Sequence, residues 1–152
     1  MEAVFLDYVL PCVCAFLACV GFTLIFNIHG CFGKLIAGVG GALGWLVYLL
    51  AGSTIFAAFL AAAAIGVFGE VMSRVRRCPV TGYVLVALLP LVPGGGIYYA
   101  MRHCVAGETE PFLNTLLRTF GMAAALAVGA MLASSVFRAL FPRLRRHGKR
   151  SP

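Results

Sequence analysis

The sequence predicts an all-α, polytopic integral membrane protein with five transmembrane helices, the fourth of them broken. Three observations lead to this fold class. Of the 152 residues, 62% are hydrophobic and only 11% are charged, whereas a soluble domain carries about a quarter charged residues. The apolar residues gather in runs close to the ~20 residues that cross a bilayer. Lysine and arginine concentrate at the ends of alternate runs, as they do on cytoplasmic loops.

Five apolar runs are separated by short connections, which leave no room for a soluble domain. The chain begins Met1-Glu2 and carries Asp7 where a secretory signal would be basic, so we interpret the first run as a membrane span. We expect one transmembrane domain over residues 1–141 and a basic cytoplasmic tail over residues 142–152. The expected spans cover residues 4–26, 35–51, 54–73, 80–101 and 120–140.

The distribution of positive charge predicts that the N-terminus lies outside the cell and the C-terminus in the cytoplasm. Lys34 lies in the first connection and the opposite face has Arg102, with Arg118 near the start of the fifth span. Five spans bring the larger clusters to the same face as Lys34. These clusters are Arg74, Arg76 and Arg77 in the third connection, and Arg138, Arg143, Arg145, Arg146, Lys149 and Arg150 at or beyond the last span.

Small residues recur four apart within the spans, which is the spacing that lets membrane helices approach closely. This pattern predicts that each span has helical neighbours. A chain of 152 residues is nevertheless short for a complete transporter, whose site lies between two structural repeats, and no internal repeat is visible. The small residues are Gly40 and Gly44, Ala57 and Ala61, and Ala125, Gly129 and Ala133.

Several classes of function are disfavoured by what the sequence lacks. The six cysteines form no Cys-x-x-Cys pair and no ligand pattern with histidine, so we expect no metal site and assign them to packing. The net charge of +7 lies in short clusters at span ends, which argues against nucleic-acid binding. No nucleophile and base pair and no phosphate-binding loop is evident. We therefore expect no enzyme, no cofactor and no ATP-driven pump.

The segment PLVPGGGIYY, residues 90–99, interrupts the fourth apolar run. Two prolines remove backbone donors and three glycines weaken a helix, so the run should divide into two half-helices near the bilayer midplane. Irregular backbone in lipid survives where it is buried in protein or lines a cavity. The half-helix from Gly96 would direct its amides into the break, which suits a carboxylate. The alternative is a packing kink. The predicted substrate-binding residues are Pro90, Pro93, Gly94, Gly95, Gly96 and Tyr98.

Ionisable residues within or near spans are functional candidates because they are costly in lipid. Asp7 either carries a coupled proton or lies at the interface. Glu70 is a second proton-coupling candidate, although its spacing from Arg74 also allows an ordinary helical ion pair. Arg118 either extends to the interface or faces an anionic substrate. The segment around Pro111 reads as the entry to a helix.

Several of these segments, taken together and in order, are similar to a known family. They are GFTLIFN at residues 21–27, GALGWL at 41–46, AAFLA at 57–61, Gly69-Glu70, and above all PLVPGGGIY at 90–98. The chain resembles the threonine/serine exporter family in its short form, which corresponds to the membrane C-terminal half of the full-length exporters. The resemblance implies a secondary exporter of the bacterial inner membrane, in which a larger partner subunit carries the other membrane half.

The resulting hypothesis is a membrane subunit that exports a small carboxylate-bearing metabolite. The resemblance implies threonine or serine, or a dicarboxylate such as succinate, with the proton-motive force as the drive. The partner is a second exporter half-subunit or another copy of this chain. Two alternatives remain: an accessory subunit that stabilises a partner transporter without touching substrate, and a small passive channel that does not depend on the proton gradient.

Overall fold

A computed structural model describes residues 8–26, 31–76 and 80–140. These residues form six α-helices and a short 3-10 helix, and this part of the chain contains no strand. The all-α prediction is therefore confirmed for the residues described. Asp7 and the expected tail at residues 142–152 lie outside them.

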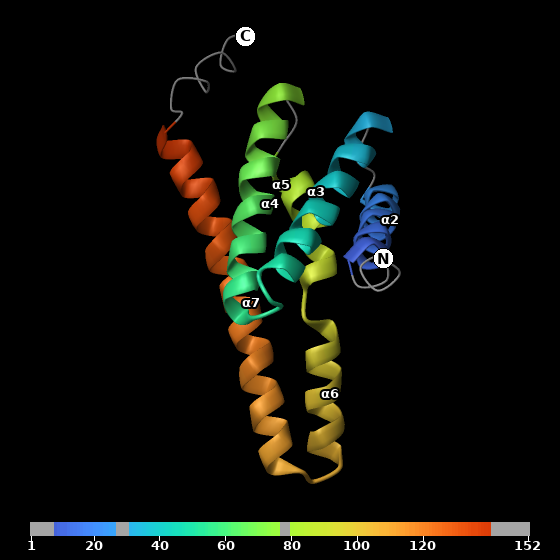
Figure 1. Ribbon diagram of the computed structural model, residues 1–152, viewed down its shortest axis with the longest axis vertical. Helices are drawn as coiled ribbons and strands as arrows, with labels where there is room; N and C mark the ends of the chain where they lie inside the picture. The colour runs from blue at the N-terminus through green and yellow to red at the C-terminus, as the bar shows by residue number, and fades with distance from the viewer. Residues whose placement is uncertain (1–7, 27–30, 77–79, 141–152) are drawn as a thin grey trace, which may run out of the picture.

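Four helices and the second part of a fifth form an apolar bundle (Figure 1). The chain continues from this bundle through the 3-10 helix η2, Leu89–Leu91, into α6, Gly94–Val105, and then returns along the long α7, Thr109–Leu140. We call residues 94–119, which comprise α6 and the start of α7, the hairpin. The helices of the bundle are α2, Leu10–Ile25; α3, Cys31–Leu50; α4, Ile55–Arg76; α5, Val80–Leu88; and α7 from residue 120 onward.

The antiparallel helices α3 and α4 are joined by a tight turn. Gly52 and Ser53 both adopt positive φ, 85° and 53° respectively. The turn is held by two hydrogen bonds between Tyr48 and Ser53, one from the Ser53 amide to the Tyr48 carbonyl at 3.1 Å and one from the Tyr48 hydroxyl to the Ser53 carbonyl at 3.2 Å. The turn therefore fixes how α3 and α4 lie against each other.

Small residues bring the helices of the bundle together, as their spacing predicts. Gly129 of α7 lies against the backbone carbonyl of Phe59 on α4, and Gly66 of α4 lies against Ala133. Between α3 and α4, Gly44 contacts Ile65. Side chains larger than hydrogen would hold these helices apart. The main core cluster consists of Ala58, Ala61, Ala62, Ile65, Ala87, Leu91 and Leu126.

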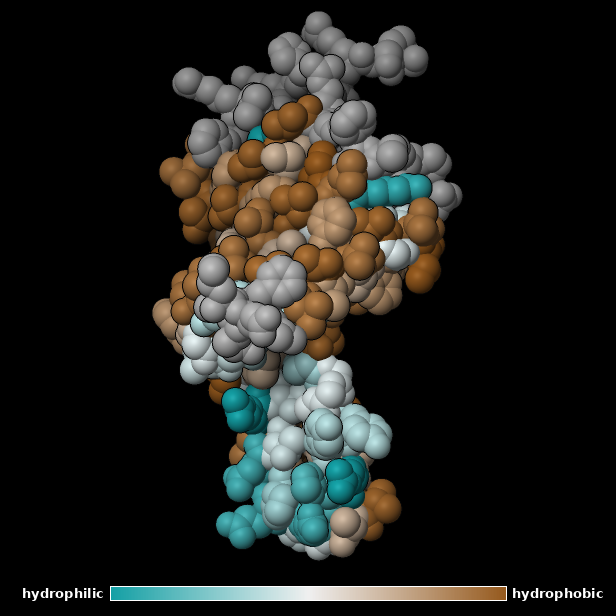
Figure 2. Space-filling model, turned by 45° about the vertical axis from the view of Figure 1, so that its right-hand side comes forward, coloured by the Kyte–Doolittle hydropathy of each residue, from teal (hydrophilic) through white to brown (hydrophobic). Residues whose placement is uncertain are grey.

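The hairpin extends away from the bundle, and α6 packs against the first part of α7 (Figure 1). Its two helices are joined by a short turn in which Gly107 has a φ of 76°. Figure 2 shows that the surface at this end is mostly hydrophilic, whereas the surface of the bundle is mostly hydrophobic. The molecule thus has an apolar part suited to lipid and a more polar projection.

The helix that contains the fifth expected span begins before that span does. Residues 102–119 were expected to form a connection, but α6 continues to Val105 and α7 begins at Thr109. The helix starts early because Glu110 and Pro111 favour a first helical turn. With 32 residues, α7 is ~48 Å long, which exceeds the ~30 Å hydrocarbon layer. Which of its turns lie in lipid stays a prediction.

Helix length limits the number of spans but does not determine it. Three helices, α3, α4 and α7, are long and apolar enough to cross a membrane, and the bent pair that includes α5 and α6 brings the total to four. With 16 residues, α2 is a shorter apolar helix. The five-span count stays a prediction.

The described part of the chain has cationic side chains toward both ends of the molecule. Lys34 near the start of α3 and Arg74 near the end of α4 lie toward one end, and Arg102 and Arg118 lie in the hairpin at the other (Figure 1). The larger clusters expected at the first end, Arg77 and the residues from Arg143 onward, lie outside the described residues. Which face is cytoplasmic stays a prediction.

Candidate functional site

The fourth apolar run is broken where its two prolines lie. The segments Gly82–Leu91 and Gly94–Val105 are bent by 45° at the break. Pro90 lies within η2, after which Val92 is extended, with φ −61° and ψ 125°. Pro93 follows with φ −78° and ψ 58°. Because neither proline can donate a backbone hydrogen bond, the helix stops here and restarts at Gly94. The predicted broken helix is confirmed.

The backbone at the break is partly satisfied by local hydrogen bonds. The Val92 amide donates to the Leu89 carbonyl at 3.2 Å, and the Gly94 amide donates to the Val92 carbonyl at 2.7 Å. The amide of Ile97 donates to the Pro93 carbonyl at 3.4 Å. The amides of Gly95 and Gly96 have no backbone acceptor among the described residues. These are the donors that the start of a helix leaves available.

The three glycines of the break have different surroundings. A Cβ atom added at Gly94 or Gly95 would meet nothing within 4 Å. A Cβ atom added at Gly96 would collide with the side chain of Thr119 on α7. Gly96 therefore allows α6 to approach α7 closely, whereas Gly94 and Gly95 leave open space on the exposed side of the break.

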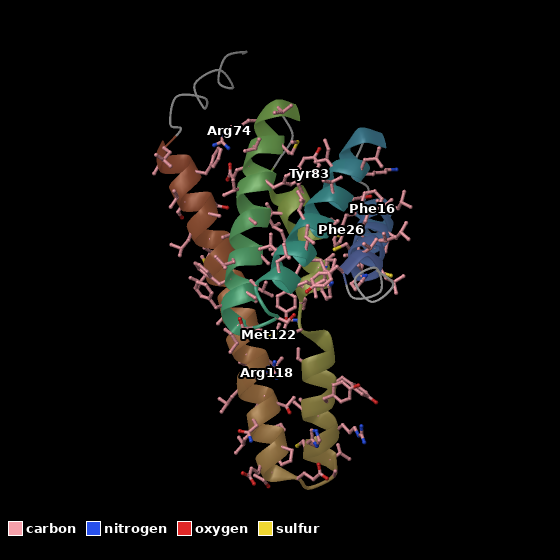
Figure 3. The ribbon with its side chains drawn as sticks, in the orientation of Figure 1. Phe16, Phe26, Arg74, Tyr83, Arg118 and Met122 are labelled. Atoms are coloured by element: carbon pink, nitrogen blue, oxygen red, sulfur yellow. The ribbon has the colours of Figure 1, made fainter. Side chains whose placement is uncertain are left out.

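A pocket with a volume of about 470 Å³ lies between the start of α6 and the facing turns of α7. Backbone and proline form its α6 side, and its α7 side carries the polar side chains. The Thr119 hydroxyl donates to the Thr115 carbonyl at 2.6 Å. Figure 3 shows Arg118 and Met122 on α7, near the height at which α6 begins. The lining residues are Pro93, Gly96, Asn114, Thr115, Arg118, Thr119 and Met122.

The break lies at the end of the bundle. Gly96 packs against Thr119, and two residues further along α7 Gly121 faces Ile55, the first residue of α4. The break is therefore near the height of the turn between α3 and α4. The sequence predicted two half-helices that meet about halfway along the fourth run, near the bilayer midplane. The second half-helix, α6, extends away from the bundle, and the depth of the break in the membrane stays a prediction.

The chain matches one family model, described as "Threonine/Serine exporter, ThrE", over residues 11–136. The match covers 126 of 152 residues (136 − 11 + 1) and includes the bundle, the break and the pocket. The chain belongs to the threonine/serine exporter family. Neither the comparison with curated proteins nor the comparison with solved structures gives a match. As a member of this transporter family with several long apolar helices, it is a multi-pass membrane protein of amino-acid export.

Only part of the predicted substrate site gathers around the pocket of this exporter. Pro93 and Gly96 line it, and Gly94 and Gly95 adjoin it in the chain. Pro90 is half-buried within η2 and is not in the lining. Tyr98 is 67% exposed, and its ring packs edge-on against Tyr99 with centroids 5.5 Å apart, so neither tyrosine lines the pocket. A role for Pro90 or Tyr98 in substrate binding stays a prediction.

Sequence reasoning missed the contribution of α7. Asn114, Thr115 and Thr119 were placed in the connection that enters the last helix and were not considered as site residues. They lie in α7 and share one side of it with Arg118 and Met122. Their spacing held the signal: Asn114, Arg118 and Met122 are four apart, as are Thr115 and Thr119. This spacing places side chains on one helical face.

Glu70 lies far from the pocket and forms the helical ion pair that its spacing allowed. Its carboxylate is 2.7 Å from the Arg74 guanidinium, which also donates to the Glu70 carbonyl at 2.9 Å. The guanidinium lies over the Phe137 ring, 4.4 Å from its centroid. Glu70 is 2% exposed. Fifteen residues separate it from Ile55 on α4, a distance of ~22 Å. It therefore does not contact a ligand in the pocket directly.

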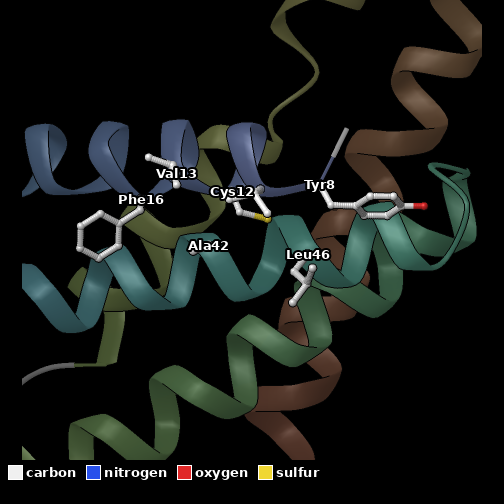
Figure 4. A pocket seen from close by; sticks show the side chains of 7 residues that line it. Tyr8, Cys12, Val13, Phe16, Ala42 and Leu46 are labelled. Atoms are coloured by element: carbon white, nitrogen blue, oxygen red, sulfur yellow. The ribbon is translucent and has the colours of Figure 1, made fainter. Parts of the chain in front are cut away.

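A second pocket, of about 380 Å³, lies between α2 and α3 (Figure 4). Its lining has no charged side chain, so it suits apolar chains rather than a carboxylate. The lining residues are Tyr8, Val9, Cys12, Val13, Phe16, Ala42 and Leu46.

The described cysteines behave as packing residues or surface thiols. Cys12, Cys14, Cys19 and Cys104 are free, and the buried Cys19 thiol donates to the Val86 carbonyl at 3.3 Å. No group of three or more histidine, cysteine or acidic residues that could hold a metal ion occurs in the described part of the chain.

Proposed function

We propose that this chain is the membrane subunit of a secondary exporter that moves a small carboxylate-bearing metabolite across the bacterial inner membrane. The substrate would be threonine or serine, or a dicarboxylate such as succinate. The proton-motive force would drive its export. The observation that carries the proposal is the broken helix beside an open, partly polar pocket, in a chain of the exporter family.

The start of α6 offers favourable electrostatics for a carboxylate. The first amides of a helix point outward with partial positive charge, and this end of the helix dipole attracts anions. At this break the amides of Gly95 and Gly96 are the available donors. Because Gly94 and Gly95 carry no side chain and have open space beside them, a substrate can approach the backbone closely.

The exposed surface of the hairpin supports the need for a second half. The hairpin projects from the bundle, and large apolar side chains of α6 are half exposed or more. Apolar surface of this kind marks interaction sites. A second exporter half-subunit, or another copy of this chain, would cover it and close the pocket. The exposed side chains on α6 are Ile97, Tyr98, Tyr99, Met101 and Val105.

Coupling to protons would use Asp7 or Glu70. In the structure Glu70 is ionically paired with Arg74, so protonation of its carboxylate would weaken this pair and release the guanidinium. Because Glu70 is ~22 Å along α4 from the level of the break, its protonation would act on the pocket through movement of α4 against α7. These two helices pack along each other.

The proposal is tested by export from cells that express this chain with its partner half, using Gly95→Leu. A Cβ atom at this position meets nothing within 4 Å and Gly95 is exposed, so folding and membrane insertion should be retained. It would cover the available amides, and export of threonine or succinate should be lost. Gly21→Leu is the matched control, because Gly21 also has nothing within 4 Å but lies on α2.

The same assay separates the alternatives. Unchanged export by the Gly95→Leu complex would remove the break from the substrate site and would favour an accessory role, in which variants stay active whenever the complex assembles. Export that persists after the proton gradient is collapsed would favour a passive channel. Cells that express each subunit alone show whether both halves are required.

A further inference from the structure

We propose that Arg118 is the residue that binds the substrate carboxylate, with Asn114 and Thr115 as the neighbouring hydrogen-bonding groups on the same wall of the pocket. The inference rests on the proposed function of this pocket and adds the side chains that would recognise the ligand. Three features of the structure support it: the availability of the guanidinium, the absence of a competing acid from the lining, and the position of the helix start opposite.

The guanidinium of Arg118 is available for a ligand. It makes no hydrogen bond or ion pair with any of the described residues, although it lines the pocket. Arg74 differs, because its guanidinium is bound to Glu70 and covers Phe137. Arg102 lies in the last turn of α6, where a positive charge is favoured by the helix dipole. Within the hairpin, Arg118 is thus the arginine that faces a pocket.

No acidic side chain lines the pocket to neutralise Arg118. At the far end of the hairpin, Glu108 is paired with His103 at 2.6 Å. Glu110 lies in the first turn of α7, eight residues before Arg118, which corresponds to ~12 Å along the helix. A carboxylate entering the pocket therefore has no internal competitor. The planar guanidinium can receive it with two parallel hydrogen bonds.

The other polar groups of the pocket complement this contact. The Asn114 amide lies one turn before Arg118 on the same helical face, and Thr115 carries a hydroxyl beside it. Across the pocket lie Pro93 and Gly96 at the start of α6. A small carboxylate held by Arg118 would thus place its remaining polar atoms in the space between α7 and the amides of Gly95 and Gly96.

The inference is tested with Arg118→Gln and Arg118→Lys in the complex of full-length subunits. Loss of a charge-assisted contact should lower export of both L-threonine and succinate roughly 10- to 100-fold for Arg118→Gln. Arg118→Lys retains the charge but loses the paired geometry, so it should mainly raise the substrate concentration for half-maximal export. Arg102→Gln is the matched control, because it removes the same charge from the same hairpin outside the pocket. Its export should stay within about twofold of the unchanged protein.

Direct binding separates this inference from the proposed function. Trp45, the sole tryptophan, packs against the core cluster that Met122 of the pocket also contacts. Its fluorescence in the purified full-length chain can therefore report titration with succinate. The unchanged complex could export neither L-threonine nor succinate, while succinate binds to the unchanged chain and not to Arg118→Gln. In that case the inference stands and the proposed function fails. Export or binding that Arg118→Gln leaves unchanged, or an absence of both in the unchanged protein, overturns the inference.

Discussion

The bundle and the break use glycine in opposite ways. In the bundle, Gly44, Gly66 and Gly129 each lie against a neighbouring helix, so that a Cβ atom would collide with it. At the break, Gly94 and Gly95 have nothing within 4 Å. The open space beside two consecutive glycines therefore favours access to the backbone, which is the property a binding site needs.

The largest effect should come from the bundle, with Gly129→Leu. A Cβ atom at this position would come 2.5 Å from the carbonyl oxygen of Phe59, which belongs to the backbone of α4 and cannot rotate away. We expect the variant to lose at least about 3 kcal/mol of stability, at the upper end of overpacking effects. Thermal unfolding of the purified protein measures this loss. Gly21→Leu, at an open position on α2, should unfold close to the temperature of the unchanged protein.

A smaller effect should distinguish the glycines of the break from one another. Gly96→Ala should destabilise the protein by about 1–3 kcal/mol, because its methyl group collides with Thr119. Gly95→Ala should be neutral or should stabilise it by up to about 1 kcal/mol, because alanine favours helix and space is available. Chemical denaturation of both variants checks the difference.

Thr119→Ala supplies the second half of a double-mutant cycle for this contact. It removes the hydroxyl and methyl groups that a Cβ atom at Gly96 would meet, so the double variant should recover most of the stability that Gly96→Ala loses. Equal stability of the Gly95→Ala and Gly96→Ala variants would contradict the packing of α6 on α7 at this point.

The sequence predicted those features that depend on local chemistry. Pro90 and Pro93 break a helix wherever they occur, and the small residues around Gly129 pack at helical spacing. The entry to a helix near Pro111 followed from the same local rules. These features needed no knowledge of which helix lies beside which.

The pocket could not be predicted in the same way, because it depends on tertiary pairing. Asn114 and Arg118 meet the start of α6 only because the chain reverses at Gly107 and α7 returns beside α6. Counting apolar residues began the fifth span at residue 120 and assigned the polar first turns of α7 to the connection before it. The helix continues through them because its backbone hydrogen bonds do not depend on the polarity of its side chains.

The least disruptive prediction concerns where the hairpin lies relative to the membrane. Cys104 is exposed on α6. In a variant that retains Cys104 and replaces the other five cysteines by serine, we expect a membrane-impermeant maleimide to label intact cells. Export should remain near that of the unchanged protein. Labelling that requires permeabilised cells would contradict the orientation predicted from the sequence. A thiol that stays protected on both sides in the isolated chain would put the hairpin in lipid, and the break would then lie within a span after all. Protection that arises only when the partner half is present would instead identify the hairpin as the surface that the partner covers.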